Sequence, residues 1–210
     1  MSERQRWTGR QRRIGLTGGI ASGKSSVSQF LAQQGIPVLD ADVYAREALA
    51  PGSKAAETVL QRFSHLLHHP PEDREQVNAT SRQIDRQALG QIVFNDAVER
   101  LWLEQLIHPI VKERLEKEIE LHSKASALAL VIPLLFETGL DKLCTEVWVV
   151  SCSKQQQQER LMTRNGLSAI AAARRIEAQW PLERKRQLAD QVIDNSGQPN
   201  AWQNQIIKLL

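Results

Sequence analysis

A glycine-rich segment near the start of the chain constrains the fold more than any other feature. Residues 18–25 read Gly-Gly-Ile-Ala-Ser-Gly-Lys-Ser, which fits the pattern G-x-x-x-x-G-K-[ST]. The preceding residues 13–17 form a short apolar run, as expected of a buried strand. Apolar residues in 24–34 recur at helical spacing, and Gly35 is a typical helix end. A strand, a tight loop and a helix in this order predict a phosphate-binding loop.

The chemistry of this segment points to a nucleoside triphosphate. Backbone N–H groups of such a loop turn inward onto phosphate oxygens, and the positive end of the following helix faces the same anion. Lys24 would reach the β- and γ-phosphates, and the hydroxyl of Ser25 could coordinate Mg²⁺.

Further apolar runs predict a parallel sheet. Residues 36–40 form a second strand, so the start of the chain is a βαβ-like unit, which requires parallel strands. Three more strands are predicted at 128–132, 146–150 and 191–194. Helices are predicted at 42–49, 55–63, 85–94, 97–106, 109–122, 153–164, 168–178 and 201–210. The chain is therefore expected to be an α/β protein with a long helical insertion.

Composition excludes several classes of protein. With 210 residues, of which 41% are hydrophobic and 24% charged, the chain has an ordinary globular composition. Its two cysteines, Cys144 and Cys152, form no CxxC pair and are expected to be idle thiols. The longest apolar stretch, 127–136, is interrupted by Pro133 and is too short to span a bilayer.

The basic character of the chain does not require a nucleic-acid partner. The net charge is only +3, and aromatic residues, which stack bases, make up only 5% of the chain. Several of the arginines lie in residues 1–12. We expect this segment to be a frayed extension rather than a targeting peptide. We therefore expect a protein that binds neither nucleic acid nor membrane. We also expect it to be cytoplasmic and a monomer, although the sequence leaves an oligomer open.

The loop motif leaves several classes of nucleotide-binding protein open, and the rest of the chain narrows them. An Asn-Lys-x-Asp motif, which a GTPase would use to read the base, is missing from the sequence. The third predicted strand continues as Ile-Pro-Leu-Leu-Phe-Glu at 132–137, without the aspartate of a motor ATPase. A small-molecule kinase needs only the loop, an acceptor pocket, a base and cations that cover the transferring charge.

Candidates for these roles follow the predicted strands. Asp40 and Asp42 come at the carboxyl end of the second strand, the edge of a parallel sheet where ligands bind. Asp42 could act as a general base, or either aspartate could simply cap the next helix. Arg160 and Arg164 share a helix face and could belong to a mobile lid, or to a solvated basic surface. His108 could be functional or a core residue.

The order of motifs along the chain is similar to that of the dephospho-coenzyme A kinase family. The resemblance covers residues from about 14 to 210. The loop alone is shared with many kinases, but the joint order of the other motifs is specific. These motifs are Asp40-Ala41-Asp42 with Arg46, Asp85-Arg86-x-x-Leu89-x-x-x-Val93-Phe94, Leu103-Glu104-x-x-x-His108-Pro109, Pro133-Leu134-Leu135-Phe136-Glu137, Gln157-x-x-Arg160-Leu161-x-x-Arg164, Arg175-Ile176-x-x-Gln179, Ala189-Asp190 and Asp194-Asn195.

The resemblance implies a three-layer P-loop kinase fold with a five-stranded parallel sheet, a helical acceptor-binding region and a lid. A single kinase domain would span 13–210, after the basic extension at 1–12. Its core would comprise 13–52, 126–152 and 183–210, its helical region about 53–125 and its lid about 153–182. The implied activity is ATP-dependent phosphorylation of the ribose 3′-hydroxyl of dephospho-CoA, with Mg²⁺, as the final step of coenzyme A synthesis.

The resemblance also implies roles for individual residues. Asp42 would be the base, while Lys24, Arg160 and Arg164 would balance the transferring charge. Nucleotide would be bound by Gly18, Gly19, Ile20, Ala21, Ser22, Gly23, Lys24, Ser25, Ser26, Arg160 and Asn195, with Ser25 on the metal. The acceptor would lie near Asp42, Arg46, His108, Leu134, Leu135, Phe136 and Glu137. One departure is Ala21, which stands where many members carry glycine.

Two other hypotheses stay open on the residues. The chain could be a P-loop kinase for another acceptor, such as a nucleoside, shikimate or gluconate. It could also be a nucleotide-binding switch without catalysis, or a nucleic-acid partner, whose binding to polynucleotide would depend steeply on salt. No motif in the sequence decides whether ATP or GTP is the nucleotide.

Overall fold

A computed structural model describes residues 6–68 and 83–210 of the chain. The chain divides into two compact units. The first, which we call the sheet unit, comprises Met1–Ala41 and Lys117–Leu210. The second, the helical unit, comprises Asp42–Glu116.

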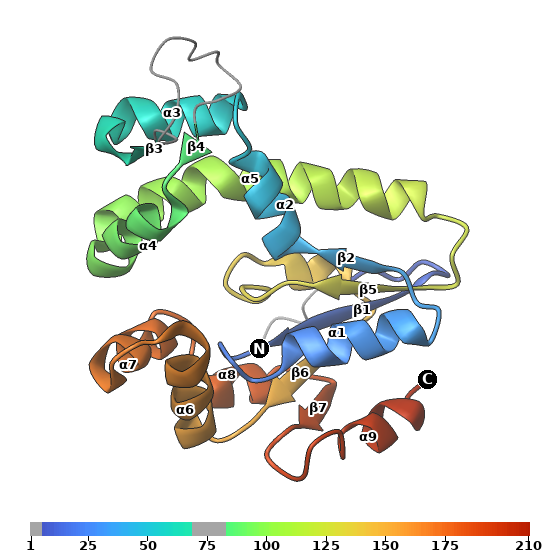
Figure 1. The fold of residues 1–210 in the computed structure, drawn as a ribbon. Helices are drawn as coiled ribbons and strands as arrows, with labels where there is room; N and C mark the ends of the chain where they lie inside the picture. The colour runs from blue at the N-terminus through green and yellow to red at the C-terminus, as the bar shows by residue number, and fades with distance from the viewer. Residues whose placement is uncertain (1–5, 69–82) are drawn as a thin grey trace. The chain divides into compact units, whose positions relative to one another are not determined.

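The sheet unit contains the predicted five-stranded sheet, and all its strands are parallel (Figure 1). The strand order is β2-β5-β1-β6-β7, so the first strand of the chain lies at the centre of the sheet. The strands are β1 (Arg12–Gly18), β2 (Val38–Asp40), β5 (Ala127–Val131), β6 (Glu146–Ser151) and β7 (Gln191–Asp194). The α/β fold and its parallel sheet are thereby confirmed, and the glycine-rich loop leaves the carboxyl end of the central strand.

One face of the sheet is covered by α1 (Lys24–Gln33) and α9 (Gln203–Ile207) (Figure 1). Alternate residues of the strands point to this face because successive side chains of a strand point to opposite sides. In β1 these are Ile14 and Leu16, both fully buried. Across the layer, Phe30 and Trp202 meet edge to face with ring centroids 5.5 Å apart, which joins the two helices.

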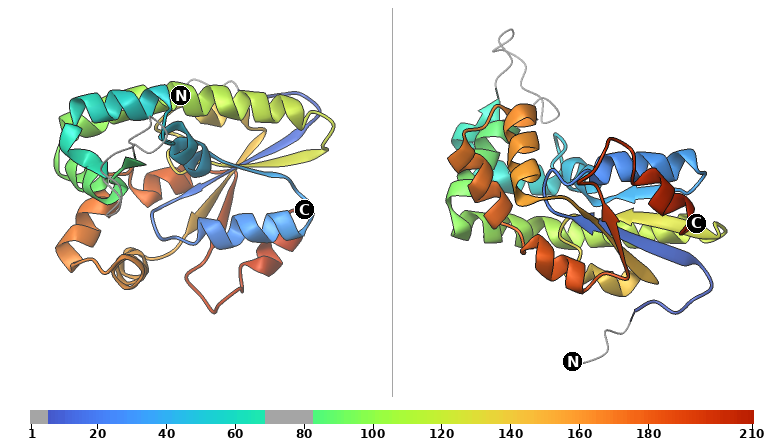
Figure 2. Two further views of the ribbon diagram at one scale, coloured as in Figure 1. Left: turned by 45° about the horizontal axis from the view of Figure 1, so that its top comes forward. Right: turned by 90° about the horizontal axis from the view of Figure 1, so that it is seen from below.

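Three further helices follow β6 in the sheet unit: α6 (Lys154–Asn165), α7 (Ala169–Glu177) and α8 (Leu182–Gln187) (Figure 2). Ser153 and Ser168 cap the first two, each accepting a hydrogen bond from a backbone N–H of the first turn. Both helices lie within a residue of their predicted bounds, 153–164 and 168–178. The short helix α8 is not predicted, because its run of charged residues carries no apolar period.

The helical unit is built around its own apolar cluster, which includes Val59, Phe63 and Leu89. Its helices are α2 (Ala41–Ala48), α3 (Lys54–Arg62), α4 (Arg86–Asn95) and the larger part of α5 (Ala97–Leu121), whose residues after 116 belong to the sheet unit. A short 3-10 helix, η1 (Ser64–Leu66), precedes an antiparallel pair of strands, β3 (Leu67–His68) and β4 (Gln83–Ile84). This pair is unpredicted because two residues are too few to show a strand period.

The prediction of separate helices at 97–106 and 109–122 is wrong, since α5 is continuous through Pro109. Proline in a helix interior costs roughly 3 kcal/mol, because it removes a hydrogen bond and crowds the preceding turn. Against this cost, buried residues recur every four positions on both sides of the proline, at Ile107, Val111 and Leu115. One continuous apolar stripe favours one helix over two.

The expectation that the basic N-terminal segment is frayed is wrong for Arg6, Gln11 and Arg12, whereas residues 7–10 are exposed. Gln11 is buried, and its side-chain amide donates to the carbonyls of His122 and Ala125 at 2.8 and 3.0 Å. Arg12 begins β1 and donates to Glu146 Oε1 at 2.6 Å, while the Arg6 guanidinium pairs with Asp190. Residues 1–5 lie outside the described part of the chain.

The two cysteines are free and buried, as the sequence predicts. Burial is the main cause that raises the pKa of Cys144 to about 12, and the nearby Asp141 carboxylate adds to it. In the described ranges, no helix is both long and apolar enough to cross a bilayer.

The raised pKa of Cys144 predicts that stability falls as pH rises from about 9 towards 12. Over this range the folded thiol stays protonated, whereas an unfolded thiol of pKa ~8.5 loses its proton, which favours unfolding by up to about 1.4 kcal/mol per pH unit. Urea unfolding at pH 8, 9 and 10 measures this slope. The Cys144→Ala variant should lose this part of the slope although its stability is lower at every pH, so equal slopes would contradict the assignment.

Candidate active site

The loop at residues 18–25 owes its shape to glycines at its two ends. Gly18 has φ 153°, and a Cβ there would lie 2.3 Å from the carbonyl oxygen of Val150 in the neighbouring strand. Gly23 has φ 105° and precedes the first residue of α1. Only glycine adopts both conformations without strain. The loop therefore returns tightly from β1 into the N-terminus of α1.

One polar group of the loop has an unmet hydrogen bond. The side chain of Ser22 is buried, with 1% of its residue surface exposed, and its Oγ has no partner among the described residues. A buried hydroxyl without a partner costs about 1–3 kcal/mol, so such groups indicate a missing ligand. An anion at the N-terminus of α1 is the kind of ligand this position favours.

Lys24 places its ammonium group against the same loop. Its Nζ donates to the carbonyls of Gly18 and Gly19 at 3.2 and 3.0 Å. The next two residues, Ser25 and Ser26, are exposed in the first turn of α1. The sequence-predicted loop residues are thus brought together on one helix end, with a cation and accessible hydroxyls.

The departure at Ala21 has a structural cost. Ala21 has φ 57°, which is the left-handed region that a Cβ disfavours by roughly 1–2 kcal/mol. The Ala21→Gly variant relieves that strain but adds about 0.5–1 kcal/mol of unfolded-chain freedom. We therefore expect Ala21→Gly to raise the free energy of unfolding by about 0.5–1 kcal/mol in urea titrations. Ala32→Gly, at an exposed position within α1, should instead lower stability, and a loss at both positions would contradict the strain.

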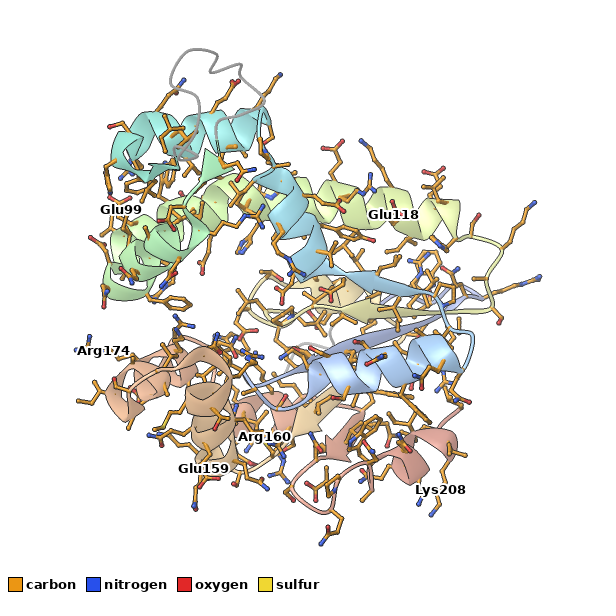
Figure 3. The ribbon with its side chains drawn as sticks, in the orientation of Figure 1. Glu99, Glu118, Glu159, Arg160, Arg174 and Lys208 are labelled. Carbon is orange, nitrogen blue, oxygen red and sulfur yellow. The ribbon has the colours of Figure 1, made fainter. Side chains whose placement is uncertain are left out.

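Arg160 and Asn195 come from α6 and from the turn after β7, and the structure joins them to the loop. Arg160 Nη2 donates to the Asn195 carbonyl at 3.0 Å, and Asn195 Nδ2 donates to the Ser22 carbonyl at 2.8 Å. Arg164 is exposed and donates to the adjacent Asn165 side chain instead. Arg160 on α6 and Arg174 on α7 are labelled in Figure 3, and Arg174 is exposed. Within the described part of the chain, Arg160 is thus joined through Asn195 to the loop, whereas Arg164 bonds its neighbour Asn165.

The segment after β5 packs beside the start of the loop. Thr17, the residue before Gly18, donates its hydroxyl to the Pro133 carbonyl at 3.0 Å. Leu135 and Phe136 are buried, so their side chains serve the core of the sheet unit. The neighbouring residues Leu134 and Glu137 are partly exposed.

Lys185 is a residue of this site that the sequence does not reveal. It is fully buried, and its Nζ lies 2.8 Å from Glu137 Oε1 and 2.9 Å from the Pro133 carbonyl. The backbone N–H of Trp180 also donates to Glu137 Oε1, at 3.2 Å. The other carboxylate oxygen, Oε2, is buried without a partner among the described residues. Nothing local distinguishes this lysine, because it lies in the charged run Leu-Glu-Arg-Lys-Arg-Gln of α8.

Asp42, Arg46 and His108 belong to the helical unit. Asp42 lies in the first turn of α2, two residues after Asp40 ends β2, and its side chain is exposed. Arg46 Nε donates to the Asp42 carbonyl at 3.1 Å, one turn along the helix. His108 is partly buried in α5 beside Pro109.

A parallel sheet whose central strand leads through a glycine loop into a lysine-bearing helix end defines a P-loop nucleotide-binding protein. The family model described as "Dephospho-CoA kinase" matches residues 12–200, so the chain belongs to the dephospho-CoA kinase family. Members of this family are phosphotransferases.

Similar proteins and structures agree with this membership. The chain is 58% identical to the dephospho-CoA kinase of Synechococcus sp. (strain CC9605), over 95% of the chain and 92% of that relative. It is 54% identical to that of Prochlorococcus marinus (strain MIT 9313), over 96% of both. The crystal structure of TT1252 from Thermus thermophilus matches with a TM-score of 0.76 and 31% identity, over 96% of this chain and 97% of that one. A dephospho-CoA kinase from Campylobacter jejuni matches with a TM-score of 0.62 and 26% identity, over 94% of each.

Proposed function

We propose that this chain is a cytoplasmic enzyme that transfers the γ-phosphoryl group of ATP to the ribose 3′-hydroxyl of dephospho-CoA. The products are coenzyme A and ADP, and the reaction is the final step of coenzyme A synthesis. The observation that carries the proposal is the match of the dephospho-CoA kinase family to residues 12–200, over a chain that keeps the loop intact.

The loop supports the ATP side of this reaction. Its backbone N–H groups and Lys24 would hold the phosphates, and the unpartnered Ser22 hydroxyl would gain an anionic acceptor there. Arg160, already tied to Asn195 beside the loop, would cover the charge that spreads over the transferring group, with Arg164 from the next turn of α6. The remaining nucleotide contacts are proposed for the loop residues and Ser26.

The acceptor side of the reaction is proposed from the residues that the family resemblance assigns to it. Asp42 would accept the proton of the attacking hydroxyl, late in an in-line transfer. Support for this role is its position two residues beyond the carboxyl end of β2, the edge of the sheet from which the loop also leaves. Arg46, His108 and the segment 134–137 are proposed to line the acceptor site; within that segment Leu135 and Phe136 would shape the turn from the core.

The residues present fit a magnesium ion that is shared with the nucleotide. Ser25 exposes a hydroxyl in the first turn of α1, and no cluster of three or more metal-ligating side chains occurs in the described ranges. Mg²⁺ usually binds to nucleotide phosphates with few protein ligands, so a full protein cage is not needed. When bound, the ion would neutralise charge on the β- and γ-phosphates.

Release of ADP from Mg-ATP, with and without dephospho-CoA, tests the proposal when combined with mass analysis of the product. We expect ADP release to depend on the acceptor, and the product to be coenzyme A, which is dephospho-CoA with one added phosphate. Lys24→Ala protein, prepared in parallel, should be inactive and so exclude a contaminating kinase. Acceptor-independent release would indicate an ATPase, turnover only with shikimate, gluconate or a nucleoside would indicate another kinase, and ATP binding without any release would indicate a binding protein.

A further inference from the structure

Two glutamine side chains hold a single residue of the phosphate loop. Gln157 Nε2 donates to the carbonyl of Ile20 at 2.7 Å, and the N–H of Ile20 donates to Gln179 Oε1 at 3.0 Å. Both backbone hydrogen-bonding groups of Ile20 are therefore satisfied by side chains. Because a backbone carbonyl only accepts and an N–H only donates, the roles of the two amides are fixed: Gln157 is the donor and Gln179 the acceptor.

The contact with Gln157 is built into the loop. Gln157 is a buried polar residue, with 3% of its surface exposed. A Cβ at Gly19 would lie 2.1 Å from its Nε2, so the amide in this position occupies the space that a side chain at residue 19 would need. The hydrogen bond from the buried Gln157 amide to Ile20 is a specific contact, because burying a polar side chain costs free energy unless the side chain is hydrogen-bonded.

The two glutamines come from opposite ends of the predicted lid. Gln157 lies in the first turns of α6, whereas Gln179 follows the end of α7. The residue after Gln179 is Trp180, and its backbone N–H donates to Glu137, in the segment proposed to line the acceptor site. Adjacent residues thus contact the phosphate loop and the acceptor segment.

We infer that Gln157 and Gln179 are positioning residues that fix Ile20, and through it the conformation of the phosphate loop, relative to both ends of the α6–α7 segment. The inference builds on the proposed kinase function, since it assigns these residues to the ATP side of that reaction. Neither glutamine has to touch a substrate. Loss of either hydrogen bond should leave the loop less ordered before ATP binds.

The opposite polarity of the two contacts gives a sharp experiment. Glutamate at position 179 keeps the acceptor oxygen, whereas glutamate at position 157 lacks the donor. Amide hydrogen exchange of Ile20, followed by NMR in the nucleotide-free protein, should be about tenfold faster in Gln179→Met and unchanged in Gln179→Glu. At position 157, both Gln157→Met and Gln157→Glu should accelerate exchange.

Steady-state kinetics supply the second readout. Gln157→Met and Gln179→Met should each raise the KM for ATP about tenfold, the equivalent of one ordinary hydrogen bond, while the KM for dephospho-CoA stays within about twofold. Because both side chains act on Ile20, the double variant should lose less than the product of the single losses. The matched control is Gln155→Met, an exposed residue of α6 that bonds Glu159 and should leave both KM values unchanged.

The inference is overturned if exchange at Ile20 is the same in all variants, or if Gln157→Glu and Gln179→Glu behave alike. Equal changes in both KM values would also overturn it, because they would indicate a general loss of structure. The exchange measurement needs no turnover, so it judges the glutamine contacts even if the acceptor proves to be a molecule other than dephospho-CoA.

Discussion

Asp42→Asn should lower kcat by about 10²- to 10⁴-fold, the usual contribution of a positioned general base. Asparagine has the shape of aspartate but cannot take the proton of the attacking hydroxyl. Asp42 is exposed in the first turn of α2, and asparagine also suits the first turn of a helix, so the substitution should preserve the helix. The KM for ATP should change little, because the phosphates are proposed to be held by the loop.

Initial rates at saturating Mg-ATP and dephospho-CoA measure this loss, with thermal unfolding to verify that the variant is folded. Glu47→Gln is the matched control, since Glu47 is another exposed carboxylate on α2 and its removal should leave kcat unchanged. Turnover of Asp42→Asn at nearly the normal rate would remove Asp42 from the role of base. A loss of equal size in Glu47→Gln would indicate that the charge of the helix matters rather than one carboxylate.

The Lys185→Met variant should lose about 3–5 kcal/mol of the free energy of unfolding, the cost of leaving a buried charge without its partner. Methionine fills a similar volume, but it cannot donate to Glu137 Oε1 or to the Pro133 carbonyl. Among the described residues, the Glu137 carboxylate would keep only the backbone N–H of Trp180, at 3.2 Å. Urea or thermal denaturation monitored by circular dichroism measures the loss.

A double variant separates the loss of the ion pair from the loss of packing. Lys185→Met combined with Glu137→Gln removes both charges and should recover most of the stability, because replacing a buried pair is far less costly than breaking it. Arg186→Met is the control on the same helix: its ion pair with Glu183 is exposed, so the change should stay within about 0.5 kcal/mol. A single variant as stable as this control would contradict the importance of the buried pair.

The parts of the structure that the sequence predicts are those with strong local signals. The loop is recognised because its glycines, lysine and serine lie within eight residues, and α6 and α7 are predicted to within a residue at each end. The five strands stand out as apolar runs between turns. Parallel pairing follows from the first βαβ unit, whereas the order of strands in the sheet depends on contacts between distant residues and is not written in any one segment.

The missed features all depend on such distant contacts. Lys185 looks like a surface residue in its own helix, and only the position of Glu137 shows that it is buried. Pro109 is a correct local signal for a helix end, but a continuous apolar stripe overrides it. The two glutamines at 157 and 179 belong to motifs that the sequence shows, yet their common partner, Ile20, becomes evident only in the folded chain.

The position of β1 at the centre of the sheet has a consequence for folding during synthesis. Its neighbours are β5, which pairs Arg12 with Ala127, and β6, which pairs Ile14 with Glu146, so both lie more than a hundred residues further along the chain. Arg12 also donates to the carbonyl of Leu209, 197 residues further along the chain. Pairings over such distances form slowly, because the entropy of closing a long loop is lost before the contacts provide any stabilisation. β1 must therefore wait unpaired until β5 and β6 have been synthesised, whereas Asp42–Glu116 can collapse around its own apolar cluster before those two strands are made.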